Sequence, residues 1–106
     1  MGEFEDREAA HEKRFAMEED KKFQARVRRD RLVGLWAAQW LEMEGSQRDA
    51  DAEAFAKAQV GKDDEAIAAD LSARFEQAGK PMDAARIRRK LAAAEAEAAA
   101  LAPKPR

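Results

Sequence analysis

Large apolar residues recur at three- and four-residue spacing along much of the chain, which is the period of an amphipathic α-helix. Leu32, Trp36 and Trp40 stand four positions apart on one helical face, and Phe23 and Val27 continue this row upstream. The pattern predicts a helix over about residues 19–43. Such a helix is roughly 37 Å long at about 1.5 Å per residue, so part of it should project beyond a small core.

Glycine and serine positions indicate what surrounds this long helix. Gly34 lies inside it, where glycine costs about 1 kcal/mol relative to alanine, so we expect another helix to pack closely at that point. Gly45 is suited to the left-handed residue that ends the helix. Ser46 is placed to cap a second helix over about residues 47–60, which Gly61 would end.

The third and fourth helices have the clearest signals. Asp63 or Asp64 is placed to cap the third helix and Asp83 to cap the fourth, while Gly79 and Pro103 mark their ends. Short connections make neighbouring helices antiparallel, so the predicted fold class is all-α, a small four-helix bundle over residues 19–102. The residues expected in its core are Phe23, Val27, Leu32, Trp36, Trp40, Ile67, Leu71, Phe75, Ile87 and Leu91.

Residues 1–18 have too few apolar side chains to order the segment against a core, so we expect a mobile amphipathic arm. If the arm forms a helix, Phe4, Glu8, His11 and Phe15 share one side of it, as in segments that fold against a partner surface. A solvated tail is the alternative reading of the same pattern. Residues 103–106, which contain two prolines, are expected to be a disordered tail.

The composition supports a thin, purely helical core. Alanine accounts for 26 residues, whereas Val and Ile together number five and tyrosine is absent, so few side chains favour strands. Charge is segregated along the chain: residues 3–20 carry eight acids and three bases, and residues 21–31 carry one acid and six bases. The net charge of −2 does not favour nucleic acid as a partner. No apolar stretch approaches the length of a membrane span, so we expect a cytoplasmic protein without direct membrane insertion.

Catalytic chemistry is poorly supported by the residue types present. The chain has no Cys, Thr or Tyr, two serines and a single histidine, His11, so we expect neither an enzyme nor a metal or cofactor site. Forked guanidinium groups bind phosphates and carboxylates. Two arginine clusters are therefore candidate contacts for a phosphate or an acidic partner, or else are solvated basic faces: Arg28, Arg29 and Arg31, and Arg86, Arg88 and Arg89.

The first forty residues carry a family resemblance. Phe4-Glu5-Asp6-Arg7-Glu8-Ala9, Lys13-Arg14-Phe15-Ala16, Arg28-Arg29, Leu32 and Gly34-Leu35-Trp36-Ala37-Ala38 resemble the zeta subunit of alphaproteobacterial F-type ATP synthases. This chain departs from the family pattern with Asp30 where the pattern has Asn and with Val33 where it has Leu. From Glu42 onward the similarity is weak.

The resemblance implies a four-helix bundle whose N-terminal arm enters the catalytic F1 head and blocks ATP hydrolysis. The partners it implies are the alpha, beta and gamma subunits of that head, with the free protein monomeric and the complex peripheral to the membrane-bound enzyme. The residues that match the arm, and are expected to bind the partner, are Phe4, Glu5, Asp6, Arg7, Glu8, His11 and Phe15.

Two other functions are compatible with the residues. The first is a small helical module that binds nucleotide or nucleic acid through its arginines. The second is a scaffold subunit that does not inhibit. Salt and ligand titrations test the former, and removal of the arm tests the latter.

Overall fold

The structure, a computed structural model, describes the backbone of residues 2–101 and the side chains of residues 19–101. It contains four helices: α1 (Gly2–Trp40), α2 (Gly45–Ala58), α3 (Asp64–Gln77) and α4 (Ala84–Ala100). The described residues form no strand, so the predicted all-α class is confirmed.

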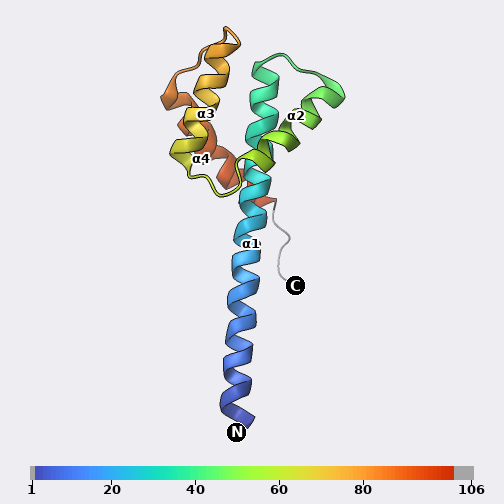
Figure 1. Cartoon of the computed structure of the whole chain (residues 1–106), viewed down its shortest axis with the longest axis vertical. Coiled ribbons are helices and arrows are strands. Elements are labelled where there is room, and N and C mark those ends of the chain that lie inside the picture. Colours follow the sequence, from blue (N-terminus) through green and yellow to red (C-terminus); the bar gives the residue numbers. More distant parts are fainter. Residues whose placement is uncertain (1, 102–106) are drawn as a thin grey trace.

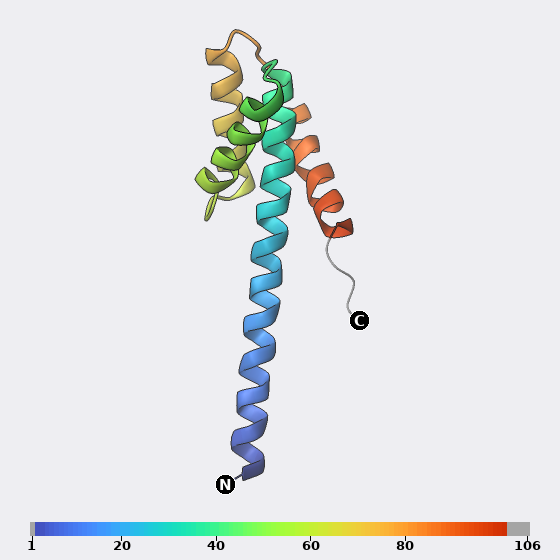
Figure 2. The ribbon, with the colours of Figure 1, turned by 90° about the vertical axis from the view of Figure 1, so that its right-hand side faces the viewer.

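One helix gives the molecule its elongated shape, which measures 65 × 27 × 20 Å. Helix α1 has 39 residues and therefore rises about 58 Å at about 1.5 Å per residue. Figures 1 and 2 show α2, α3 and α4 gathered around its C-terminal half, while the N-terminal half projects alone. The backbone continues through the predicted boundary at residue 18 without a break, so the arm and the long helix form one element.

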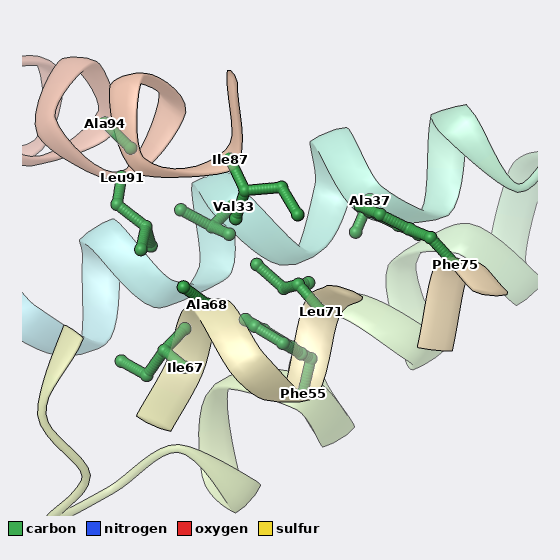
Figure 3. Packing of buried hydrophobic residues seen from close by; sticks show 10 residues of the cluster. All are labelled: Val33, Ala37, Phe55, Ile67, Ala68, Leu71, Phe75, Ile87, Leu91 and Ala94. Atoms are coloured by element: carbon green, nitrogen blue, oxygen red, sulfur yellow. The ribbon is translucent and has the colours of Figure 1, made fainter. Parts of the chain in front are cut away.

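The core lies between the four helices, around the C-terminal half of α1. Leu71 and Phe75 of α3 are fully buried, as are Val33 of α1 and Ile87 of α4 (Figure 3). Phe55 supplies the contribution of α2 and is 8% exposed. The remaining cluster members are Ala37, Ile67, Ala68, Leu91 and Ala94.

The buried face of α1 differs by one position from the predicted row. Val33 and Ala37 are fully buried, whereas Leu32, Trp36 and Trp40 are half-buried and pack against the edge of the core. The physical reason is that α2 packs closely at Gly34, next to Val33, so the face of α1 that turns toward the core is centred on Val33 and Ala37. The large rings therefore cover the rim of the core, and each tryptophan meets Phe75 edge-on.

The expected core position of Phe23 is wrong, because its side chain is 52% exposed. Val27 is half-buried. Both residues lie beside Val60, just after the C-terminal end of α2, and Phe23 also lies near Ala99 at the C-terminal end of α4, so too little of either helix remains to cover a large side chain.

Gly34 marks the crossing of α1 and α2. A Cβ atom at this position would lie 3.0 Å from Ala52 Cα and 3.1 Å from the Ala52 carbonyl oxygen. Ordinary carbon contacts are about 3.5–4.0 Å. The predicted close approach of a second helix at Gly34 is therefore confirmed, and this contact sets the distance between the two helices.

The ends of the first two helices differ from the prediction. Glu42 takes the left-handed conformation that follows α1 (φ +65°), and Gly45 is also left-handed (φ +58°) but is the first residue of α2. The Glu42 N–H donates to the Gln39 carbonyl (3.0 Å), and the Met43 N–H donates to the Ala38 carbonyl (2.9 Å), which together close the helix end. Glu44 occupies the N-cap position of α2 without a side-chain cap, so Ser46 lies inside the first turn and does not cap it.

The caps of the other helices agree with the sequence patterns. Asp63 caps α3, and its Oδ1 accepts a hydrogen bond from the Ala66 N–H (2.8 Å). Asp83 caps α4, and its Oδ1 accepts from the Ala85 N–H (3.1 Å). These side-chain caps satisfy backbone donors that a helix leaves free at its start.

Candidate functional site

The seven predicted partner-binding residues of the arm lie in the projecting part of α1. Their side chains fall outside the residues whose side chains the structure describes, so only their register along the helix is fixed. At about 100° per residue, Phe4, His11 and Phe15 lie within an arc of about 40° on a continuous helix. The remaining four are Glu5, Asp6, Arg7 and Glu8.

The first arginine cluster is divided by burial. Arg29 is only 3% exposed, and its Nε and Nη2 donate to Oδ1 of Asp30 at 3.1 and 3.0 Å. Its Nη1 donates to Oδ1 of Asp64, in the first turn of α3, at 2.7 Å. The guanidinium group of Arg29 therefore ties α1 to α3. The prediction that Arg29 contacts a phosphate or an acidic partner is wrong, because its donors already have partners inside the chain.

Burial controls the titration of this ion pair. Asp30 is 4% exposed, and burial raises its pKa above the ordinary aspartate range, although the hydrogen bonds and charge of Arg29 oppose the shift. For Arg29, burial opposes the charged form, but the hydrogen bonds and attraction of Asp30 and Asp64 outweigh it and raise its pKa. Arg29 thus stays charged, and Asp30 is the member that responds to pH.

The other two members of this cluster differ in exposure. Arg28 is half-buried and Arg31 is exposed. Neither forms an ion pair with the side chains of residues 19–101. Arg31 is thus the member of the cluster best placed to meet a partner.

The second arginine cluster lies on the exposed side of α4. The Arg86 guanidinium stacks over the Trp40 ring at 5.2 Å, and Arg88 forms a 3.5 Å ion pair with Glu65. Arg89 is exposed. Two of the three arginines therefore cover or bridge parts of the bundle, and the cluster does not converge on one binding point.

The tryptophan row is fixed by polar contacts at its edge. The Trp40 Nε1–H donates to the Lys80 carbonyl at 2.8 Å, and the Lys90 ammonium lies 5.9 Å from the centre of the Trp36 ring. The first contact satisfies the indole donor of Trp40. With Arg86 over Trp40 and Lys90 over Trp36, each indole ring has one cation near it. The tryptophans thus serve the bundle rather than an open site.

The sequence did not reveal a groove that lies between α1 and α2 where α1 leaves the bundle. Phe23 and Val27 of α1 and Ala56 and Val60, from α2 and its C-terminal turn, line this groove, and its volume is about 330 Å³. Val60 is 53% exposed. The sequence extends the apolar row of α1 upstream to Phe23 and has the apolar residue Val60 directly before Gly61. Neither feature indicated that Phe23 and Val60 would lie side by side.

Two further features bear on function. Within residues 19–101, no three His, Asp or Glu side chains gather in a way that could hold a metal ion. No helix of the described part is long and apolar enough to cross a membrane.

The fold defines a small all-helical protein in which one end of a long helix is anchored in a bundle and the other end projects from it. Comparison with family models identifies the particular family. A family model described as ATPase inhibitor subunit zeta matches residues 1–101, and the chain belongs to this family. Comparison with curated proteins and with solved structures gave no match.

Proposed function

We propose that this protein is a regulatory subunit that inhibits ATP hydrolysis by the F1 head of an F-type ATP synthase. The arm, residues 1–18, inserts at a catalytic interface between alpha and beta subunits and lies against the gamma subunit. The protein itself then acts in the cytoplasm, peripheral to the membrane-bound enzyme. Membership of a family of ATPase inhibitor subunits supports the inhibitory role.

One observation about the fold carries the mechanism: the arm is continuous with a helix whose other end is anchored in the bundle. Residues 2–18 extend α1 by about 25 Å at about 1.5 Å per residue. Such a helix can enter an interface while the bundle stays outside and limits how far the arm is inserted. Phe4 and Phe15 are the apolar anchors, and the charges of Asp6, Arg7 and Glu8 set register and the rate of encounter.

The amino-acid composition of the arm suggests that binding orders it. Six acids and three bases over residues 1–18 leave little apolar area to offset the entropy of ordering. A helix that forms on the enzyme consumes part of the interaction energy, which keeps inhibition reversible.

Full-length protein with Phe4→Ala and Phe15→Ala, added to the purified ATP synthase of the same organism, tests the proposal. Loss of two anchors should raise the concentration needed for half-inhibition by about 100-fold or more. Lys13→Ala is the matched control, because Lys13 lies on the opposite side of the arm helix. Equal inhibition by the double variant and the parent would rule out the arm as the inhibitory element.

A further inference from the structure

The groove between α1 and α2 brings together two of the large apolar side chains that residues 19–101 leave exposed. Phe23 and Val60 flank its mouth and are 52% and 53% exposed, while Val27 and Ala56 line its floor. We name this surface the Phe23 groove. A small domain that leaves two large apolar side chains exposed around one hollow has the features of a docking surface.

The rim of the Phe23 groove is basic. Arg31 and Lys57 stand on it, with Glu53 as the one acid. None of these three forms an ion pair with the side chains of residues 19–101. The groove is therefore complementary to an apolar side chain that has carboxylates beside it.

The position of the groove fixes its relation to the arm. Phe23 lies eight residues after Phe15 on the uninterrupted helix α1, a rise of about 12 Å. Insertion of the arm into an interface would therefore bring the groove to the mouth of that interface. The spacing is set by helix geometry, so the second contact adds little conformational cost.

We propose that the Phe23 groove is a second docking point of the inhibitor, which receives an apolar side chain flanked by acidic residues on the outer surface of the same enzyme head. This inference rests on the proposed function. It assigns to the bundle a role in holding the inserted arm in place, in addition to limiting how far the arm is inserted.

Paired substitutions in the full-length protein test the apolar part of the proposal. Phe23→Ser with Val60→Ser should raise the concentration for half-inhibition about tenfold or more, mainly through faster dissociation. Leu101→Ser is the matched control, since Leu101 is also apolar and 61% exposed but does not line the groove. It should leave inhibition unchanged. Thermal unfolding of each variant confirms that the bundle is intact.

The outcomes separate this proposal from the proposed function. If the parent protein does not inhibit hydrolysis, the proposed function fails. If the parent inhibits and the double serine variant inhibits at the same concentrations, the groove proposal is overturned and the function stands. Sedimentation can show instead that the free parent is a dimer and the double serine variant a monomer, while both inhibit equally. The groove is then a self-association surface, and the proposal is also overturned.

Charge reversal on the rim tests the acidic character of the partner. Lys57→Glu should slow association with the enzyme head about tenfold at low salt and reduce the salt dependence of the rate. Lys80→Glu, an equal charge change in the connection between α3 and α4 beside Trp40, is the control and should have a much smaller effect. Equal association rates for Lys57→Glu and the parent would contradict an acidic partner at this rim.

Discussion

Gly34→Ala tests whether the crossing of α1 and α2 is as tight as the structure indicates. The new Cβ would lie 3.0 Å from Ala52 Cα, 3.1 Å from the Ala52 carbonyl oxygen and 3.1 Å from Phe55 Cδ1. The aromatic ring can move, but the two backbone atoms move only with α2 as a whole. Because carbon contacts need about 3.5–4.0 Å, the helices must separate by about 0.5 Å or more.

The magnitude is a balance of two effects. Alanine improves the helix by about 1 kcal/mol, whereas overpacking a buried contact costs about 1–3 kcal/mol. We expect overpacking to dominate, with a net loss of about 1–2 kcal/mol, because the obstructing atoms are backbone. At about 4–8 °C per kcal/mol for a domain of this size, the thermal midpoint should fall by roughly 4–16 °C.

Thermal unfolding followed by circular dichroism measures this effect. Gln39→Ala is the control, because Gln39 is exposed on the same helix and its replacement should change stability by less than about 0.5 kcal/mol. Adding Ala52→Gly to Gly34→Ala should not restore stability, since the Cα and carbonyl oxygen of residue 52 stay in place. A Gly34→Ala variant that melts above the parent would refute the reasoning.

Three further predictions concern the ion pair, the aromatic rim and the arm. Burial raises the pKa of Asp30 in the folded state, so its contribution to stability is greatest below its unfolded pKa and is lost as pH rises through the folded pKa. Asp30→Asn should therefore flatten the dependence of the urea midpoint on pH above about pH 4, and an unchanged dependence would contradict this assignment. Trp36→Ala should cost about 3 kcal/mol, the lower end of the range for large aromatic residues, because the ring is only half-buried, and Trp36→Phe should recover part of it. Amide protons over residues 3–16 should exchange far faster than those around Trp36 in the free protein, and comparable protection would show that the arm is ordered before binding.

Local signals in the sequence were sufficient for α3 and α4. Ile67, Leu71 and Phe75 repeat at four-residue spacing behind the Asp63 cap, and all three are fully buried. Helices of this kind depend on residues within a few positions of one another, so periodicity and capping describe them well. The close helix contact at Gly34 was also predictable. Glycine inside a helix lowers stability relative to alanine, so its presence indicates a position where a larger side chain would not fit.

Features that depend on distant residues were not predictable in this way. Arg29 reaches Asp64, 35 positions away, and no local pattern distinguishes it from the exposed Arg31. The exposure of Phe23 depends on where α2 and α4 end beside α1, which spacing along α1 does not specify. The buried face of α1 is centred on Val33 and Ala37 because α2 packs at the neighbouring Gly34, whereas periodicity gave weight to the largest side chains.

The candidate site was predictable only in part. The arm residues from Phe4 to Phe15 were selected by their spacing and by the family resemblance, and this selection stays a prediction. The Phe23 groove could not be selected, since its two sides come from α1 and from the end of α2. Surfaces built from separate elements become visible only once the helices are placed.

Inhibition of ATP hydrolysis by the arm is the central claim, and deletion of residues 1–18 tests it most directly. The assay compares the full chain and the truncated chain on the purified ATP synthase of the same organism, after circular dichroism shows that the truncated chain still unfolds cooperatively. We predict that the full chain inhibits hydrolysis. At concentrations that give maximal inhibition by the full chain, the truncated chain should not inhibit. Equal inhibition by a folded truncated chain would contradict the account and assign inhibition to the bundle.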